Sequence, residues 1–584
     1  MPEYMEKCWN VNERGDENLI KELESSLEVP SLVASLLVQR DISTPKLAYA
    51  FFDSRLEHLH DPFLMKDMDV AVGRLMTALR NGEKIMIYGD YDVDGTTSVA
   101  LVYSFLRRFH ANLEFYIPDR YKEGYGISSE GIEAAADAGC RLIISLDCGI
   151  KAVNKVAYAQ KFGIDFIICD HHTPGEVLPP AVACLDPRRE DCPYPYKELT
   201  GCGVGFKFMQ AFCRHNHYPE TELYAYLDLV AVSIASDIAL LSGENRIMAL
   251  YGLEKLNTAP RVGLHSIIRD AHMEHKEFEI SDIVFKIGPR INAAGRIESG
   301  RDAVELLISE DEELARMMSS NIGVQNNTRK DLDRLTTQEA LEMLAGSPEL
   351  QKRCATVLFK ADWHKGVIGI VASRLTDHYY RPTVILTESQ GLVTGSARSV
   401  DGFDLYAAVE SCSDLLVTFG GHMYAVGLTM KHENLPAFQA RFESWVKAHI
   451  QPVQQVPRLD IDAEIKLKDI NSAFNGWLKR MQPFGPGNPK PLFVTRRVFD
   501  YGTSKVVGRE REHLKLELIE ECSGAILQGV AFGMGRHLQA IKSGQPFDVV
   551  YALEETVVHG KSMLQLMVRD LDFPYGDEHF DYLD

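Results

Sequence analysis

The sequence of 584 residues lacks several features that mark common classes of protein. It has no excess of positive charge, because 62 Lys and Arg stand against 83 Asp and Glu, which gives a net charge of −21. A protein whose whole surface binds nucleic acid would usually be basic, so any DNA or RNA binding must use a local basic groove or metal ions. The eleven Cys contain no CxxC pair, which argues against zinc ribbons and thioredoxin-type redox sites.

The sequence also has few apolar segments of the kind that target or anchor a protein. Residues 1–19 are charged and contain no hydrophobic region typical of a signal peptide. The most apolar stretch, residues 223–241, contains Asp228 and Asp237 and would make a poor membrane span. We therefore expect a cytoplasmic protein with no membrane partner, and by default a monomer. Its length predicts roughly four domains at about 150 residues each.

Short β-rich runs alternate with helical patterns between residues 84 and 185, which is typical of a doubly wound parallel sheet. A long helical region follows at residues 301–345, with an expected interruption near Gly323. A second α/β pattern covers residues 355–449, and period-two runs beyond the linker at 451–457 predict a small β-barrel. The expected strands are 85–88, 113–117, 142–146, 166–169, 356–359 and 383–386, and the expected helices are 98–109, 129–138, 151–162 and 366–377.

The predicted fold class is therefore α/β: a doubly wound parallel-sheet domain, a long connecting helix, a second smaller α/β domain and a C-terminal OB-like β-barrel. We expect five parts, in this order: an N-terminal helical segment (1–60), the parallel-sheet domain (61–255), a helical connector (256–350), the smaller α/β domain (351–450) and the OB-like nucleic-acid-binding domain (455–584).

Acidic residues follow three of the predicted parallel strands at the point where each strand ends. Asp90, Asp92 and Asp94 come after the first strand, Asp147 after the third, and the triplet 170–172 (AspHisHis) after the fourth. Ligands of open parallel sheets bind outside the carboxyl ends of the strands. Crowded carboxylates raise one another's pKa, and a divalent cation removes that repulsion. Carboxylate and imidazole ligands together suit Mn²⁺ or a similar ion.

Other interpretations apply to each cluster alone. The Asp-rich segment could be an Asx turn, and a HisHis pair is often a surface feature. An EF-hand is disfavoured because Leu101 stands where its twelfth position needs Glu. Asp237, in an otherwise apolar run, would need a metal, a helix N-terminus or an Arg as partner if it is buried. Since three clusters at successive strand ends are hard to attribute to chance, we predict a metal site. The glycine-rich stretch at 201–206 indicates close helix packing rather than nucleotide binding.

These motifs resemble those of the DHH phosphoesterase superfamily, whose name comes from the AspHisHis triplet. Further segments are similar to its associated domain and to its branch of single-strand-specific 5′→3′ DNA exonucleases, and together the matches span almost the whole chain in the right order. The matching segments are 90–95, Asp147 and 170–172 for the superfamily, 363–374 and 419–427 for the associated domain, and 287–297 and 485–493 for the exonuclease branch.

The resemblance implies a site with two divalent ions, Mn²⁺ or Mg²⁺. Its metal ligands would be Asp90, Asp92, Asp94, Asp147, His171 and Asp237, with Asp94 and Asp147 the candidates for bridging. His172 would lie beside the metals and touch the scissile phosphate, so the catalytic residues would be Asp92, Asp94, Asp147, His171 and His172. Contacts to the DNA backbone or the 5′-phosphate would come from Arg290, Arg296, Ser396, Arg398 and His422, for which ordinary surface or interdomain structure is the alternative.

The function implied by the resemblance is hydrolysis of single-stranded DNA 5′→3′ to 5′-mononucleotides, in DNA repair and recombination. A helicase and a single-stranded-DNA-binding protein are the implied partners. Phe484 and Phe493 of the barrel could stack on bases or belong to its core. The alternatives are a phosphodiesterase of short oligoribonucleotides or cyclic dinucleotides and, ranked below it, a non-catalytic replication scaffold. An inorganic pyrophosphatase is disfavoured because Tyr88 replaces its expected metal-binding His.

Overall fold

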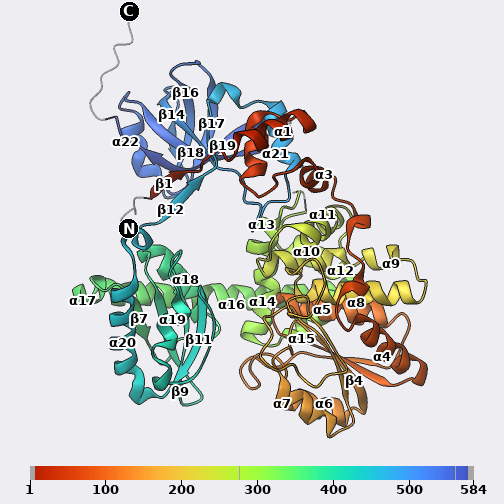
Figure 1. Cartoon of the computed structure of the whole chain (residues 1–584). Coiled ribbons are helices and arrows are strands. Elements are labelled where there is room, and N and C mark those ends of the chain that lie inside the picture. Colours follow the sequence, from red (N-terminus) through yellow and green to blue (C-terminus); the bar gives the residue numbers. More distant parts are fainter. Residues whose placement is uncertain (1–6, 275–276, 559–560, 576–584) are drawn as a thin grey trace, which may run out of the picture. The chain divides into compact units, whose positions relative to one another are not determined.

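The computed structural model describes residues 7–274, 277–558 and 561–575, so residues 1–6 and 576–584 of the first and last expected domains lie outside the described residues. The chain forms two compact units, drawn in Figure 1. The first contains residues 59–239 and 247–457, and the second contains residues 8–58, 240–246 and 458–575. Nowhere in the described part of the chain is a helix long and apolar enough to cross a membrane.

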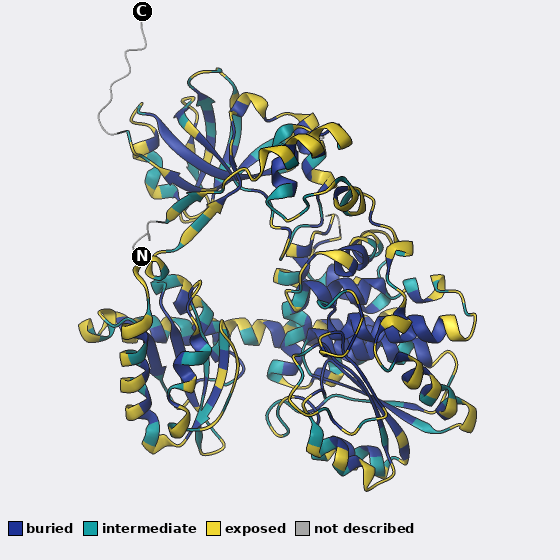
Figure 2. Cartoon of the chain, viewed as in Figure 1, coloured by how far each residue is buried: buried dark blue, intermediate teal, exposed yellow. Residues whose placement is uncertain are grey.

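A five-stranded sheet organises the first unit. All its strands are parallel, in the order β3-β2-β4-β5-β6, and they are largely buried (Figure 2). Burial on both faces explains their nearly continuous hydrophobic sequences. The first four confirm the predicted strands, whereas β6, with three residues, is too short for a periodic signal. The strands are β2 (Lys84–Gly89), β3 (Leu113–Tyr116), β4 (Cys140–Leu146), β5 (Asp165–Cys169) and β6 (Ala183–Leu185).

Helices cover both faces of this sheet. Helices α6 and α7 pack on one face, and α5 and α8 contact the strands from the other. Helix α5 begins at Val93, five residues earlier than predicted, because Asp92 caps it by accepting a hydrogen bond from Gly95 N at 3.1 Å. The helices are α4 (Met68–Asn81), α5 (Val93–Leu106), α6 (Ser129–Asp137), α7 (Val153–Gln160) and α8 (Gly201–His215).

Further helices extend the first unit, and α16 is by far the longest of them. It continues through Gly323, so the expected interruption there is wrong: one glycine costs only about 1 kcal/mol in a helix, and this helix has 34 residues. The chain breaks instead at residues 309–311, where Asp311 caps α16. These helices are α9 (Thr221–Tyr224), α10 (Leu227–Ser236), α11 (Gly243–Thr258), α12 (Val262–Asp270), α13 (Ile280–Asp282), α14 (Gly288–Ile297), α15 (Gly300–Ile308), α16 (Glu312–Ala345) and α17 (Pro348–Gln351).

A second, mixed sheet completes the first unit. Its order is β10-β11-β9-β8-β7, and only β7 and β8 are parallel. Helix α18 packs against the C-terminal half of α16. The predicted strands and helix correspond to β7, β8 and α18. The elements are β7 (Thr356–Phe359), α18 (Ile368–Tyr379), β8 (Thr383–Ser389), β9 (Leu392–Arg398), α19 (Leu405–Glu410), β10 (Leu416–His422), β11 (Ala425–Met430) and α20 (Leu435–His449).

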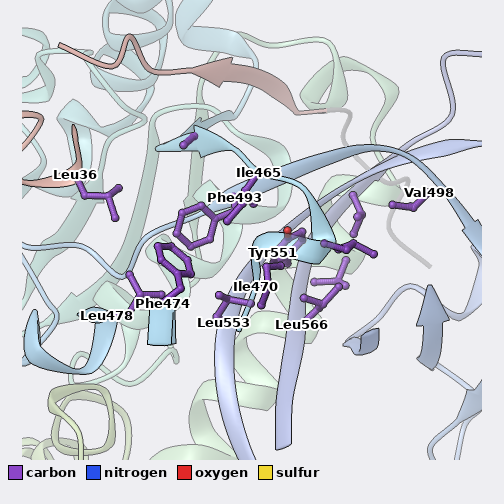
Figure 3. Close-up of a cluster of buried hydrophobic side chains, with 14 of the residues drawn as sticks. Leu36, Ile465, Ile470, Phe474, Leu478, Phe493, Val498, Tyr551, Leu553 and Leu566 are labelled. Atoms are coloured by element: carbon purple, nitrogen blue, oxygen red, sulfur yellow. The ribbon is translucent and has the colours of Figure 1, made fainter. Parts of the chain in front are cut away.

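The second unit is built on a closed five-stranded barrel. The strands follow the order β14-β18-β19-β17-β16, and β16 pairs again with β14. This is the connectivity of an OB-like barrel, as predicted. Phe493 is fully buried in the barrel core (Figure 3), so it cannot stack on DNA bases, and Phe484 packs against the same core. The elements are β13 (Ala463–Glu464), α21 (Ser472–Arg480), β14 (Phe493–Asp500), β15 (Lys505–Val507), β16 (His513–Glu520), β17 (Ile526–Ala531), α22 (Leu538–Ile541), β18 (Phe547–Val558) and β19 (Lys561–Asp572).

The N-terminal segment packs within this barrel unit. Strand β1 pairs in parallel with β12, and the Trp9 indole N–H donates to Asp570 Oδ2 at 2.7 Å. Ile20, Leu23 and Leu36 join the barrel core. Because the partners are separated by several hundred residues, no local sequence pattern could reveal this pairing. The elements are β1 (Cys8–Val11), α1 (Glu17–Leu27), α2 (Ser31–Val38), α3 (Pro45–Phe52) and β12 (Arg458–Ile461).

Candidate metal centre and nucleic-acid interface

Two carboxylates stand directly at the ends of central strands. Asp90 follows β2 and is fully buried. Its Oδ1 accepts a long hydrogen bond from Gly126 N at 3.4 Å, and its Oδ2 is buried without a hydrogen-bond partner. Asp147 follows β4 in a left-handed conformation with φ of +60°. Because this conformation is uncommon for residues other than glycine, Asp147 shows the local backbone strain often found at functional sites.

The first turn of α5 holds a third buried carboxylate, Asp94. Its oxygens accept hydrogen bonds from Gly201 N (2.7 Å) and Cys202 N (2.8 Å) at the start of α8, and from Ser233 Oγ (2.7 Å). The N-terminus of α8 therefore stabilises the negative charge of Asp94. A Cβ on Gly201 would lie 2.5 Å from Asp147 Cβ. The glycine-rich stretch thus permits close packing, as its sequence indicated.

His171 lies among these carboxylates. Its Nε2 is 3.1 Å from Asp147 Oδ1, 3.5 Å from Asp94 Oδ2 and 4.0 Å from Asp237 Oδ2. Burial, more than any other influence, lowers the pKa of His171. A neutral imidazole is the form that binds metal ions, so the environment of His171 favours a ligand role.

Asp237 is less buried than its apolar sequence context suggested. Helix α10 ends at Ser236, and the side chain of Asp237 is 34% exposed. The condition of burial considered for Asp237 is therefore met only in part, since the residue follows the apolar helix instead of lying within it. Partial burial, followed by the charges of Asp94 and Asp92, raises the pKa of Asp237 to about 8. The carboxylate still faces the same cluster as His171.

All six predicted ligands lie in one cluster. The potential ligand atoms form three groups, and within each group the atoms lie within 4.8 Å of one another. Two of the groups share no residue, and the third shares one residue with each of them. Burial, reinforced by neighbouring carboxylates, raises the pKa of Asp90, Asp92 and Asp147. A divalent cation would remove this repulsion and give Asp90 Oδ2 a partner, so the residues fit Mn²⁺ or Mg²⁺. The groups are Asp90, Asp92 and Asp147; Asp94, His171 and Asp237; and Asp147, His171 and His172.

His172 is held beside the cluster by Asp170. Its Nδ1 is 2.7 Å from Asp170 Oδ1, while Asp170 Oδ2 accepts from Ile150 N at 2.9 Å. Burial favours the neutral form of His172, but the bond to Asp170 and nearby carboxylates raise its pKa to about 9. These neighbours therefore favour the protonated form of His172. Asp170, whose oxygens are engaged by these donors, orients His172 and is not among the grouped ligand atoms.

Sequence reasoning missed the loop at residues 124–128, which contacts Asp147 and His172 through Tyr125. Tyr125 Oη lies 3.1 Å from His172 Nε2 and donates to the Asp147 carbonyl oxygen at 3.3 Å. Tyr88 Oη donates to the Gly126 carbonyl at 2.9 Å and accepts from Ser128 N at 3.1 Å. Tyr88 therefore supports the loop through its hydroxyl group. The ProAsp pair at 118–119 and the GlyTyrGly sequence at 124–126 were local signals of turns here.

Asp186 was missed together with the short strand β6, which it follows. It is fully buried, its Oδ1 accepts from Arg188 N at 2.7 Å, and its Oδ2 has no hydrogen-bond partner. Burial raises the pKa of Asp186 to about 7. It adds another carboxyl group at the same edge of the parallel sheet.

Arginines from a loop, two helices and one strand form a second cluster in the first unit. Arg296 Nη1 donates to the Gly366 carbonyl at 3.1 Å, and Arg398 Nη1 donates to Ser396 Oγ at 2.9 Å. Burial, then the like charges of Arg120, Arg329 and Arg398, lower the pKa of Arg296 to about 10. Closely spaced, half-buried cations of this kind suit a polyanion such as a nucleic-acid backbone. The cluster consists of Arg120, Arg296, Arg329 and Arg398, and we call it the arginine cluster.

The two remaining predicted contacts lie differently. His422 ends β10 opposite Ala425, which pairs with Arg398, so it lies at the same end of that sheet as the arginine cluster. Arg290 donates to the Lys286 carbonyl at 2.7 Å. The charge of Asp270 acts on the pKa of Arg290, and the charge of Arg290 acts on the pKa of Lys330. The structure therefore brings Arg296, Ser396 and Arg398 together. Arg290, on the same helix as Arg296, lies near Lys330, on which Arg329 of the arginine cluster also acts.

Three family models match the chain in succession. The N-terminal domain of the DHH family matches residues 84–234, the DHHA1 domain residues 351–448, and the RecJ OB domain residues 461–570. The single-stranded-DNA-specific exonuclease RecJ of Bacillus subtilis (strain 168) is 36% identical over 96% of this chain and 70% of its own length. The protein of the same description from Haemophilus influenzae is 32% identical over 88% of this chain and 92% of its own length.

The chain belongs to the RecJ family. The fold agrees with that of RecJ from Thermus thermophilus in complex with Mn²⁺, with a TM-score of 0.83 and 27% identity over 97% of this chain and 80% of that one. The Mg²⁺ complex of that RecJ gives a TM-score of 0.77 at 25% identity, over 97% of this chain and 78% of that one. The carboxylate and imidazole groups of this RecJ-family chain suit either kind of ion, Mn²⁺ or Mg²⁺.

Proposed function

We propose that this chain degrades single-stranded DNA from the 5′ end and releases 5′-mononucleotides, using two divalent cations. Its family membership makes it a metal-dependent exonuclease specific for single-stranded DNA. The polarity, the products, the number of ions and the residues that act are the parts that we propose here.

The observation that supports two ions is the pair of ligand groups that share no residue. One would be held by Asp90, Asp92 and Asp147, and the other by Asp94, His171 and Asp237. Asp147 Oδ1, 3.1 Å from His171 Nε2, is the best candidate to connect them. Divalent cations held there supply an acidified water as nucleophile and a counter-charge for the phosphate oxygens.

Residues of this chain perform the remaining tasks. Asp170 holds His172 as an imidazolium, which would donate a hydrogen bond to an oxygen of the scissile phosphate. The N-terminus of α8 fixes Asp94, so that this ligand needs no reorganisation when substrate binds.

The arginine cluster would determine that degradation starts at the 5′ end of the strand. A terminal 5′-phosphate carries more negative charge than an internal phosphodiester, and a half-buried cationic cluster discriminates in its favour. Arg398, with its Nη1 bonded to Ser396 Oγ, and Arg296 are the contacts that we propose for it. His422, at the same sheet end, would contact the adjacent backbone. We keep Arg290 as a contact to the strand farther from the 5′ end.

We further propose that the protein acts as a cytoplasmic monomer in DNA repair and recombination. A single-strand-specific enzyme needs a source of unpaired DNA, which a helicase would supply and a single-stranded-DNA-binding protein would keep open. The expected domain boundaries belong to the same proposal; three of the expected domains contain the segments matched by the family models.

A time course on end-labelled DNA tests this function. A long single strand, labelled at either end, and its blunt duplex would be incubated with Mn²⁺, Mg²⁺ or EDTA. We expect immediate release of a 5′-labelled mononucleotide, dependence on metal and no attack on the duplex. Immediate release of the 3′ label instead would contradict the polarity. Inactivity on the long strand with hydrolysis of short oligoribonucleotides or cyclic dinucleotides would favour that alternative activity.

A further inference from the structure

Phe285 is an aromatic side chain with an unusual degree of exposure. At 76% it is the most exposed large hydrophobic residue in the described chain. It lies in a π-helical turn, η3 (Ile283–Ile287), whose first and last residues are fully buried. Such turns occur frequently at functional sites because the additional residue changes the direction of side chains. The turn is thus firmly packed on one side while it presents Phe285 to solvent.

This turn lies next to the candidate metal centre. Gly288, directly after it, packs so closely on Ser236 that a Cβ there would lie 2.7 Å from Ser236 Oγ. Ser236 precedes the candidate ligand Asp237, and η3 contacts α10, the helix that Asp237 follows. Ile238, on the other side of Asp237, is 66% exposed. Exposed apolar side chains therefore lie close to the candidate ligand on this side.

Cationic side chains accompany Phe285. Arg290 folds back to the Lys286 carbonyl, with an Nη1–O distance of 2.7 Å. Helix α14, which carries Arg290, packs along α16, which carries Arg329 and Lys330. The charges of Arg290 and Arg329 both act on Lys330. Asp270 is the acid that acts on Arg290. An aromatic ring beside clustered cations is the arrangement with which proteins bind single strands, through base stacking and phosphate contacts.

We propose that Phe285 stacks on a base of the substrate strand next to the metal centre, while Arg290 and Lys330 contact the phosphates of that strand. This inference rests on the proposed nuclease function and extends it to the recognition of unpaired DNA. In a duplex the base faces are covered by neighbouring pairs, so the ring would favour a single strand. The excess of cations selects nucleic acid over an apolar protein partner as the occupant of this surface.

Binding of an oligo(dT) strand in EDTA, where no hydrolysis occurs, tests the contact directly. Phe285→Ala is expected to raise the Kd by roughly tenfold, the effect of losing one stacked base. The matched control is Phe162→Ala, which removes a partly exposed aromatic (39%) that follows α7, before β5, at the opposite edge of the sheet. We expect that control to bind like the unmodified protein.

A second variant reports stacking without relying on affinity. Phe285→Trp keeps an aromatic face, and its indole emission should be quenched by oligo(dT). An abasic strand of the same length has the same phosphates but no bases, and should leave the emission unchanged. The spectrum of the unmodified protein, which has four Trp, is subtracted in each case.

The outcomes separate this inference from the function on which it rests. Hydrolysis of a 5′-phosphorylated thymidine dinucleotide and of long single strands by the unmodified protein with Mn²⁺ tests the proposed function by itself. If the unmodified protein fails on both substrates, the proposed function is wrong. If it is active but Phe285→Ala binds oligo(dT) as tightly as before, or the abasic strand quenches Phe285→Trp equally, the stacking proposal is overturned.

Discussion

The carboxylate cluster and the arginine cluster of the first unit are two concentrations of like charge with opposite sign. In the first, burial and mutual repulsion raise the pKa of Asp90, Asp92 and Asp147. In the second, burial and neighbouring cations lower the pKa of Arg296 and Arg398. Each arrangement is unfavourable by itself and becomes favourable when a ligand of opposite charge binds.

The two clusters differ in how their members are fixed. Asp94 is held by two backbone amides at the start of α8, and Asp147 lies under Gly201 without room for a Cβ. Arg296 and Arg398, by contrast, are long side chains that bond to carbonyl and hydroxyl oxygens. A rigid cluster suits ligands with strict coordination geometry, and a more adaptable one suits phosphates. Substitutions should therefore stop catalysis in the first cluster and weaken binding in the second.

Asp147→Asn should give the largest effect. We expect exonuclease activity on single-stranded DNA to fall by roughly 10³-fold or more, because the substitution removes the charge of the carboxylate that connects both ligand groups. Without metal, the variant should melt at a higher temperature than the unmodified protein, since a repelling charge is lost. Adding Mn²⁺ should raise the melting temperature of the unmodified protein far more than that of the variant. Full activity in the variant would refute the metal assignment.

Gly201→Ala tests the rigidity of the same cluster without altering a ligand. The new Cβ would lie 2.5 Å from Asp147 Cβ and 2.7 Å from its Cα, so the backbone that carries this ligand must shift. A shift of this size should lower kcat by roughly 10²-fold. The control is Gly203→Ala, whose Cβ would come no closer than 3.4 Å to Leu199. Equal kcat values for both variants would show that the cluster adapts more easily than we infer.

Arg398→Ala should have a smaller effect, mainly on KM. Loss of one charged contact to a terminal phosphate should raise KM by about tenfold for a 5′-phosphorylated strand, with kcat nearly unchanged. A strand with a 5′-hydroxyl lacks the extra charge and should be much less affected. Steady-state kinetics on both strands measure the difference. The same increase for both strands would assign Arg398 to the internal backbone and remove the basis of the proposed polarity.

The sequence predicted the carboxylate cluster better than the arginine cluster for a physical reason. Asp90, Asp147 and the triplet 170–172 follow strands of one parallel sheet, and parallel strands bring their carboxyl ends to one edge whatever the intervening loops do. Arg296 and Arg398 meet only through the packing of separate elements, α14 and β9. Their proximity was implied by family resemblance, and neither spacing nor periodicity could provide it.

The fold shows the same division between local and long-range information. Hydrophobic patterns predicted the first four parallel strands because each pattern depends only on neighbouring residues. The pairing of β1 with β12 depends on partners such as Trp9 and Leu459, and no local pattern encodes it. The early start of α5 was missed because Gly95, Thr96 and Thr97 are weak helix formers, while the Asp92 cap and the contacts to α8 stabilise that turn.

Trp9→Phe gives the smallest expected effect and tests a buried carboxylate outside the first unit. The Trp9 indole N–H, a neutral donor, lies 2.7 Å from Asp570 Oδ2. The carboxylates of the metal centre would instead be stabilised by a cation. Burial raises the pKa of Asp570 to about 6. Because this pKa lies above its unfolded value, the contribution of Asp570 to stability falls as pH rises from about 4 through 6.

The indole N–H stabilises the ionised form of Asp570, so its loss should matter most when that form predominates. Trp9→Phe should lower the free energy of unfolding by about 1–2 kcal/mol at pH 7.5 and by less at pH 4.5. Urea unfolding followed by circular dichroism at both pH values measures the difference. An identical loss at both pH values would mean that Trp9 acts through packing alone. In that case a neutral donor would not relieve a buried carboxylate, and Asp90, whose Oδ2 has no hydrogen-bond partner, would depend on a cation still more strongly.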